Sequence, residues 1–364
     1  MRSSFSKALV EELINDILNK KSPKTLENTK IIVKTEEKAG SLKQIKVLKQ
    51  RQNNICGYHA LYNLLTFLSR NNHHFLLEKS EFWNFYHKIK EILLVKAKAK
   101  YYGYPWNEDT VCNDILERDF VKYLLKDILK SKDITDLPEM ARGSIKNGIM
   151  TLEKIKEVQA VFDKFQNEKQ YQHGFLIGVG NHWIALVIQK NESLTSYYMD
   201  SRELPVLGKS KEFLLDYVYK RFEKNEKRNI TKKSEEEKKY FIEMFYSSLL
   251  DTQFSLNLIH SCALGEMNFL HECSRIIIIG QIQSFFEHTS NEDDIEKYFE
   301  EYVPPNLMIK DIKKAIEMVG ENNLKKDVIL EIKKFIEYSK TIKKNSKIIQ
   351  DFKIRIKTLL IKNS

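Results

Sequence analysis

The stretch HGFLIGVGNHWIALVIQKNESLTSYYMDSRE, residues 173–203, indicates the fold class of this chain. It consists of short runs of β-branched and aromatic residues separated by polar breaks, a pattern typical of β-strands. The residues on either side have mostly helical spacing, beginning with an amphipathic segment at residues 5–20. Because the strands lie between two helical regions and do not alternate with helices, the sequence predicts an α+β fold.

Two of these strands, NHWIALVI and SYYMDS, are predicted to form an antiparallel hairpin whose turn centres near Asn191. His182 lies nine residues before this centre and Asp200 nine residues after it, so the two are expected to face each other across the ladder. A carboxylate beside an imidazole fixes the tautomer and the orientation of the ring. Both strands are apolar on both faces, which predicts a hairpin covered on each side.

Upstream of the hairpin, Cys56 comes at the start of a predicted helix in the stretch QRQNNICGYHALYNLL, residues 50–65. The helix is indicated by apolar residues at helical spacing: Ala60, Leu61, Leu64, Leu65 and Leu68. The N–H groups and partial positive charge of a helix N-terminus favour a thiolate and can stabilise an oxyanion. Gly57 allows close approach of a substrate backbone. The alternative is a buried structural cysteine, since free cysteine is among the most buried residue types.

Two glutamines precede this cysteine, Gln50 by six residues and Gln52 by four. A side-chain amide near the thiolate could complete an oxyanion hole with the Cys56 N–H group. The alternative interpretation is that both glutamines are polar surface residues.

Cys262 is the rival to Cys56 as nucleophile, because it follows the predicted histidine and acid and has Gln253 upstream. The step between Gln253 and Cys262 is nine residues, however, and no glycine follows the cysteine. His59, one turn into the predicted Cys56 helix, is interpreted as a packing or surface residue.

Together, QRQNNICG followed by a helix, then NHWIALVI, then YYMDS resemble the papain-like cysteine peptidases that act on ubiquitin and its relatives. The His-Trp and Asp-Ser strands are similar to those of the SUMO-specific proteases, in which the cysteine comes after the histidine and the aspartate. The order in this chain, Cys then His then Asp, matches the Josephin and MINDY deubiquitinases and papain. The resemblance covers roughly residues 44–205.

This resemblance implies a papain-like fold, in which a helical lobe carrying the nucleophile helix packs on a central antiparallel sheet. It implies that Cys56 is the nucleophile, His182 the general base and Asp200 the residue that orients the histidine. Gln50 would be the oxyanion donor, since its six-residue step to the cysteine fits papain and MINDY. The Josephin step is one residue shorter, which leaves Gln50 and Gln52 as alternatives.

The resemblance also implies a substrate, the peptide or isopeptide bond after the C-terminus of ubiquitin or a ubiquitin-like protein. In the SUMO-specific proteases the tryptophan beside the histidine covers a channel that admits a Gly-Gly tail, so Trp183 is expected to select such a tail. Gly57, Gln52 and Asn181 are expected to bind substrate with it. The alternative for Trp183 is a core residue in a buried strand.

Two further functions fit the same residues. A thiol acyltransferase with the same Cys-His-Asp order would pass the acyl group to an amine, and an inactive module on this fold would only bind a ubiquitin-like protein. None of these functions implies a metal or an organic cofactor.

The composition predicts an intracellular protein, in the cytoplasm, the nucleus or both. The chain has 4 cysteines in 364 residues without paired spacings, which suits a reducing compartment. The first residues mix charge into every turn and so differ from a signal peptide, and no run of 18 apolar residues occurs, which predicts no membrane span.

Three parts are predicted along the chain. They are an N-terminal helical extension (residues 1–40), a papain-like catalytic domain (41–303) with a charged insertion near 220–240, and a basic helical segment (304–364). Two prolines mark the last boundary, because proline cannot continue a helix. From Leu307 onward there are 15 basic against 7 acidic residues, in a chain whose net charge is +10. This segment is expected to bind a protein partner or an anionic surface such as nucleic acid; the alternative is a solvated helical face.

Overall fold

The computed structural model describes most of the chain, and that part contains helices and one mixed sheet, three of whose strands are consecutive while the strands at residues 41–44 and 134–137 lie between helices. This confirms the predicted α+β class. By its internal contacts the chain divides into two compact units, Met1–Ala141 with Lys164–Leu264, and Arg142–Asp163 with Gly265–Ser364. The described residues are 2–19, 41–50, 55–70, 76–100, 129–137, 140, 145, 150–179, 182–202, 209–226, 235–288, 305–320, 323, 326–341, 350 and 354.

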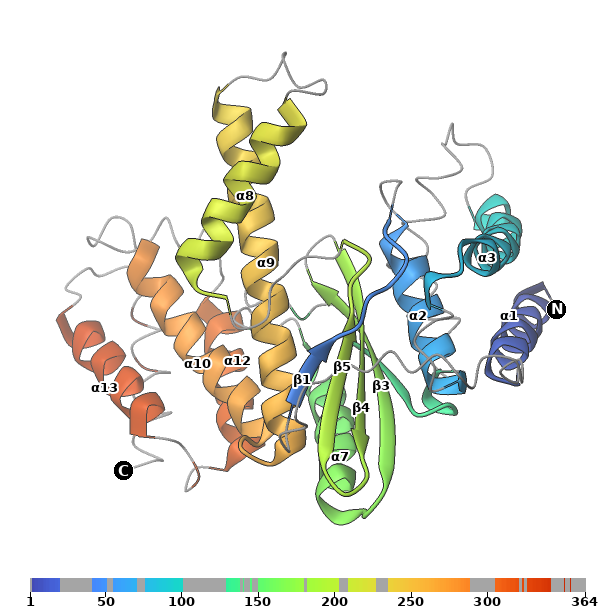
Figure 1. Cartoon of the computed structure of the whole chain (residues 1–364). Helices are drawn as coiled ribbons and strands as arrows, with labels where there is room; N and C mark the ends of the chain where they lie inside the picture. The colour runs from blue at the N-terminus through green and yellow to red at the C-terminus, as the bar shows by residue number, and fades with distance from the viewer. Residues whose placement is uncertain are drawn as a thin grey trace. The chain divides into compact units, whose positions relative to one another are not determined.

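The first unit contains a five-stranded sheet with the strand order β1-β5-β4-β3-β2 (Figure 1). Its antiparallel centre is formed by β3 (Tyr171–Val179), β4 (His182–Lys190) and β5 (Leu194–Met199). At the edges, β1 (Ser41–Gln44) pairs in parallel with β5, and β2 (Ile134–Leu137) pairs in parallel with β3. The β-branched and aromatic runs of residues 173–203 therefore supply the three central strands.

The turn between β4 and β5 is displaced from its predicted centre. Lys190 still pairs with Leu194, so residues 191–193 form the turn and its centre is Glu192. The predicted centre near Asn191 is therefore wrong by one residue, because the polar segment QKNESLT, residues 189–195, has its midpoint at Glu192.

The displaced turn changes which residues oppose each other. The ladder places Met199 opposite Ala185, and the same register puts Asp200 opposite Ile184. The prediction that Asp200 directly faces His182 is wrong by two residues. The two are instead diagonal neighbours on one face, a separation that long side chains can bridge.

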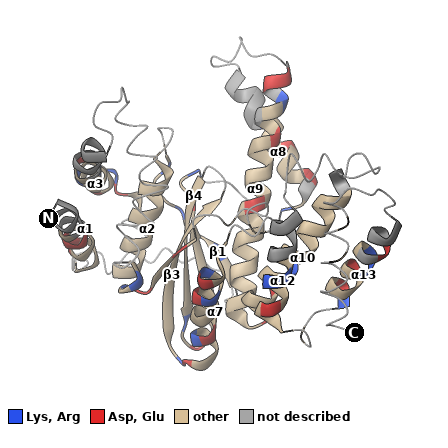
Figure 2. Ribbon diagram, turned by 180° about the vertical axis from the view of Figure 1, so that it is seen from behind, with Lys and Arg blue, Asp and Glu red and all other residues tan. Residues whose placement is uncertain are grey.

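Helices cover both faces of the central strands, as predicted. α2 (Cys56–Arg70) packs on β4, and Trp183, Ala185 and Val187 share a buried cluster with its apolar residues. α9 (Glu235–Leu264) contacts β3, β4 and β5 from the other side (Figure 1). The strands themselves carry few charged residues (Figure 2), as a sheet buried on both faces requires.

The predicted helix after Cys56 is confirmed, and its apolar positions are buried. Gly174 of β3 lets this helix approach the sheet closely, because a Cβ atom there would lie 2.8 Å from the Cδ1 atom of Leu64. α1 (Arg2–Asn19) and α3 (Lys79–Lys100) contact α2 and each other. α1 confirms the amphipathic helix predicted at residues 5–20.

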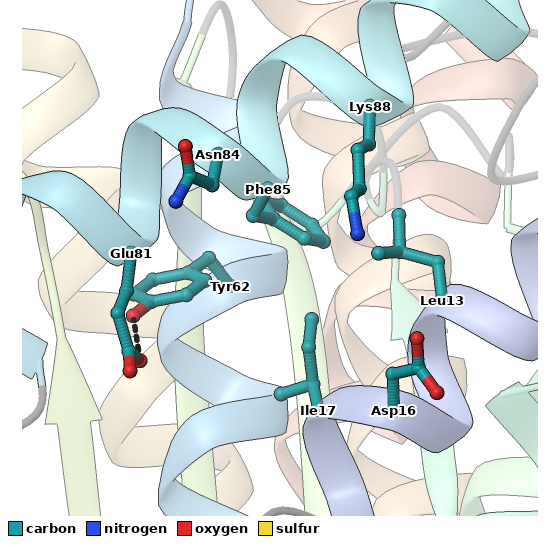
Figure 3. A pocket seen from close by; sticks show the side chains of 8 residues that line it. All are labelled: Leu13, Asp16, Ile17, Tyr62, Glu81, Asn84, Phe85 and Lys88. Carbon is teal, nitrogen blue, oxygen red and sulfur yellow. Dashed lines mark hydrogen bonds between the residues drawn. The ribbon is translucent and has the colours of Figure 1, made fainter.

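A small pocket of about 90 Å³ lies where α1, α2 and α3 meet (Figure 3). Asp16 comes from α1, and Glu81 and Lys88 come from α3. Tyr62 of α2 donates a hydrogen bond of 3.4 Å to the Glu81 carboxylate. None of the predicted site residues lines this pocket.

The second unit is helical in its described residues. α10 (Phe269–His288) contacts α12 (Pro305–Val319) and α13 (Lys326–Thr341), and the rings of Phe285 and Phe335 meet edge to face at 5.0 Å. The helical pattern predicted for the C-terminal segment is confirmed over α12 and α13. The predicted boundary at residues 303 and 304 falls inside this unit, and the predicted domain limits stay predictions.

Two long helices contain most of the predicted charged insertion near residues 220–240. α8 (Lys211–Glu226) precedes α9 and contacts it, and residues 227–234 between them lie outside the described part. Across the described residues, no helix combines the length and apolar character needed to cross a membrane.

Candidate active site

The candidate site lies at the end of the sheet where β3 ends, β4 begins and β5 ends. His182 is the first residue of β4, and Asp200 follows β5 directly. The Nε2 atom of His182 lies 2.7 Å from Oδ1 of Asp200, a hydrogen bond between two buried side chains. The structure thus brings the two predicted residues together, although across a diagonal of the ladder.

Asp200 is held as a carboxylate. Burial alone would raise its pKa, but the His182 imidazole and the charge and backbone N–H of Arg202 lower the pKa to about 2. The backbone N–H of Arg202 donates a 2.8 Å hydrogen bond to the same Oδ1 atom that contacts His182. Asp200 is therefore an acceptor at neutral pH, and it fixes where the proton of the imidazole must lie.

His182 has a defined tautomer as a result. A carboxylate can only accept hydrogen bonds, so Nε2 of His182 carries the proton and Nδ1 is the basic nitrogen. Burial lowers the pKa of His182, the Asp200 carboxylate opposes this effect, and Arg202 adds to it. The ring is thus neutral at rest and has a carboxylate in contact that stabilises its protonated form.

Arg202 is a site residue that the sequence reasoning missed. Its Nε atom lies 3.7 Å from Oδ1 of Asp200, its Nη1 atom donates a 3.3 Å hydrogen bond to Ser248 of α9, and its guanidinium lies 5.8 Å from the ring centre of Phe245. The only sequence signal was its position two residues after Asp200. Its partners on α9 could not be read from the sequence.

Cys56 is the first residue of α2 and is buried. The first turn of this helix contains no acidic residue, so no carboxylate there opposes a thiolate. His59, three residues after Cys56, has a pKa lowered first by burial and then by His182. Cys56 begins the helix that packs on β4, the strand that His182 begins.

His59 is a packing residue and not a surface residue. Its ring stacks on Phe82 with the ring centres 3.9 Å apart, and only 2% of the residue is exposed. Burial and then His182 lower its pKa to about 3, so it stays neutral at physiological pH. Of the two interpretations made from the sequence, the structure therefore supports packing.

Gln50 reaches the same end of the sheet through the segment that follows β1. Its backbone N–H donates a 2.9 Å hydrogen bond to the carbonyl of Ser201, and its Oε1 atom accepts one of 3.1 Å from the Ser201 hydroxyl. These two bonds orient the side-chain amide with its oxygen toward Ser201. Gln50 therefore lies beside the residue that follows Asp200, although 151 positions separate Gln50 from Ser201.

Of the four residues predicted to bind substrate, the structure describes two. Gly57 is the second residue of α2 and is buried. Trp183 is also buried and belongs to the cluster under α2, which agrees with the core alternative; a role in covering a substrate channel stays a prediction. Gln52 and Asn181 lie outside the described residues.

Cys262, the rival nucleophile, is a buried residue near the end of α9. His260, two residues earlier, has its Nδ1 atom 2.7 Å from the hydroxyl of Ser196 on β5. Ser196 precedes Asp200 by four positions, roughly 13 Å along a strand. His260 therefore contacts the sheet away from the His182–Asp200 pair.

Among the described residues, no group of three or more His, Cys, Asp or Glu side chains could hold a metal ion. Comparison of the chain with protein-family models, with curated proteins and with solved structures found no match.

Proposed function

We propose that this chain is a thiol-dependent hydrolase that cleaves peptide or isopeptide bonds after the C-terminus of ubiquitin or a ubiquitin-like protein. One observation carries the proposal, the buried hydrogen bond between His182 and Asp200 at the end of a sheet on which α2, the helix that begins at Cys56, packs. A carboxylate that accepts a hydrogen bond from one imidazole nitrogen leaves the other nitrogen unprotonated and able to act as a base. A thiol nucleophile needs such a base beside it.

In the proposed reaction, Nδ1 of His182 takes the proton of the Cys56 thiol, and the thiolate attacks the carbonyl carbon of the scissile bond. The oxyanion that forms accepts hydrogen bonds from the Cys56 backbone N–H and the Gln50 side-chain amide. The C–N bond then breaks, and His182 gives its proton to the leaving amine, which leaves a thioester on Cys56. His182 next deprotonates a water molecule that attacks the thioester, and this step releases the carboxylic acid and restores the thiol.

A papain-like fold is part of this proposal. The helix that begins at Cys56 packs on the antiparallel centre of the sheet, and the histidine begins one central strand while the acid follows the next, which supports it. The substrate class is supported by the resemblance of the three motifs to proteases of ubiquitin and its relatives. The glycine after the nucleophile, Gly57, fits a substrate whose backbone passes close to the helix start.

A panel of ubiquitin and ubiquitin-like proteins carrying a C-terminal electrophile tests the proposal. We expect the wild-type chain to form a covalent adduct with one of them and Cys56→Ala to form none. Cys262→Ala is the matched control, since it removes another buried thiol, and it should be captured like the wild type. Capture that survives in Cys56→Ala and disappears in Cys262→Ala would contradict the assignment.

The same panel separates hydrolysis from the other two functions. A hydrolase releases the free carboxylic acid of a fluorogenic substrate, whereas an acyltransferase gives an amide when an amine is added in excess. A module that only binds retains the modifier on a column without forming an adduct. We expect release of the acid to dominate in the presence of the amine.

A further inference from the structure

Asp200 is held almost entirely through one of its two oxygens. Oδ1 contacts His182 Nε2 at 2.7 Å, the Arg202 backbone N–H at 2.8 Å and the Arg202 Nε atom at 3.7 Å. Oδ2 is buried and has no hydrogen-bond partner. A tilt of the carboxylate would therefore disturb all of these contacts together, and the contacts to Oδ1 decide its orientation.

Arg202 connects this carboxylate to the helix on that face of the sheet. Its Nη1 atom donates to the Ser248 hydroxyl, and its guanidinium lies over the Phe245 ring, both on α9. A planar guanidinium held on two sides has few alternative positions, so its positive charge stays within ion-pair distance of Asp200. The contacts all lie within the first unit.

We propose that Arg202 is a positioning residue, which anchors the Asp200 carboxylate to α9 and thereby fixes the orientation of the His182 ring. The inference names a positioning residue for the reaction proposed above and rests on that function for its kinetic consequence. Its structural consequence, an ordered hydrogen bond between His182 and Asp200, can be measured whether or not the chain is an enzyme.

The test compares Arg202→Gln, Arg202→Lys and Ser248→Ala with the wild-type chain. Two quantities are measured: the downfield proton NMR signal of His182 Nε2–H in its bond to the carboxylate, and kcat and KM on a fluorogenic ubiquitin-like substrate. Arg275→Gln is the matched control, because Arg275 has a similar ion pair, 2.7 Å from Asp327, in the second unit. Ser248→Ala removes only the anchor on α9, and it keeps the test decisive if the Arg202 variants fold poorly.

We expect Arg202→Gln to weaken the His182 signal and to lower kcat by roughly 10- to 100-fold with little change in KM, as for loss of a charged partner of a buried group. Arg202→Lys should keep part of the His182 signal and part of kcat. Ser248→Ala should lower the signal and kcat by less than Arg202→Gln does, and Arg275→Gln should match the wild type. An unchanged signal in Arg202→Gln and Ser248→Ala, or equal losses in the Gln and Lys variants, would overturn the inference. If the wild type neither hydrolyses nor captures any modifier, the proposed function fails while the NMR comparison still decides the role of Arg202.

Discussion

Two buried histidines, His182 and His173, lie on the same face of the same sheet, and their surroundings give them different chemistry. His173 on β3 is opposite Ile188 of β4, roughly 20 Å along the ladder from His182. Its Nε2 atom lies 2.9 Å from the Thr135 hydroxyl, and its Nδ1 atom lies 3.0 Å from the Tyr171 hydroxyl. Both of its nitrogens are thus bonded to neutral groups.

The difference shows what a buried imidazole needs in order to act as a base. Burial, with a contribution from Lys164, lowers the pKa of His173 to about 3, and no carboxylate opposes this shift. At His182 the Asp200 carboxylate does oppose it. Hydroxyl partners stabilise a neutral ring that holds strands together, whereas a carboxylate stabilises the protonated ring that a catalytic cycle must form.

Replacing each histidine with glutamine should give the largest difference in kcat between the two sites. His182→Gln should lower kcat by about 10⁶-fold, the size of loss known for removal of a catalytic base that acts with its nucleophile. His173→Gln should leave kcat within a few-fold, because its partners lie at the other end of the ladder. Steady-state rates on a fluorogenic ubiquitin-like substrate measure both. Comparable losses in the two variants would mean that packing of the sheet, and not base chemistry, distinguishes these residues.

Changing the carboxylate should give the next largest effect. Asp200→Ala should lower kcat by about 10⁴-fold, since the ring loses the group that sets its tautomer. Asp200→Asn should lose less activity, because its amide oxygen can still accept from Nε2. The new NH₂ group would occupy the site of Oδ2, which has no hydrogen-bond partner, and should cost about 1–3 kcal/mol of unfolding free energy. Full activity in Asp200→Ala would show that another residue orients His182.

Acid should destabilise the fold partly through His173. Its pKa lies near 3 in the folded chain and near 6.5 when unfolded, so the unfolded state binds more protons as pH falls below 6.5, and stability is lost down to about pH 3. Between pH 6.5 and 5 this one residue contributes a loss of about 2 kcal/mol. Urea unfolding of the wild type and of His173→Gln at these two pH values measures it. Between these two pH values, the unfolding free energy of the variant should fall by about 2 kcal/mol less than that of the wild type. Equal losses in the two proteins would contradict the assigned environment of His173.

The smallest effect is expected from one hydroxyl beside His173. Burial, followed by Asp133 and Glu168, raises the pKa of Tyr171 to about 12, so its hydroxyl stays protonated and neutral in its hydrogen bond with Nδ1 of His173. Tyr171→Phe removes this bond and should lower the unfolding free energy by about 1 kcal/mol with no change in kcat. Thermal unfolding and the substrate assay check the two parts. A fall in kcat would connect the His173 cluster to the site and weaken the comparison.

The candidate site shows where sequence reasoning succeeded and where it failed. Hydrophobic spacing identified the helix that begins at Cys56, and β-patterning identified the strands that carry His182 and Asp200. The register predicted between those strands was wrong by two residues, because the turn centres on Glu192 and not on Asn191, and one residue at the centre shifts each pair by two. His182 and Asp200 meet in spite of this error, because they lie on the same face of the sheet as diagonal neighbours.

Local periodicity in the sequence was enough to predict the α+β class, the helix that begins at Cys56 and the strands of residues 173–203, whereas the short edge strands β1 and β2 were not predicted. Which buried polar groups meet depends on the three-dimensional packing of the elements. The bond between Gln50 and Ser201 and the bond between Arg202 and Ser248 join residues on different elements, and no local pattern specifies either one. Such contacts depend on strand register and on how closely a helix packs on the sheet. A shift of one residue in the register, or a looser packing of the helix, would separate groups that must lie within about 3 Å to form a hydrogen bond.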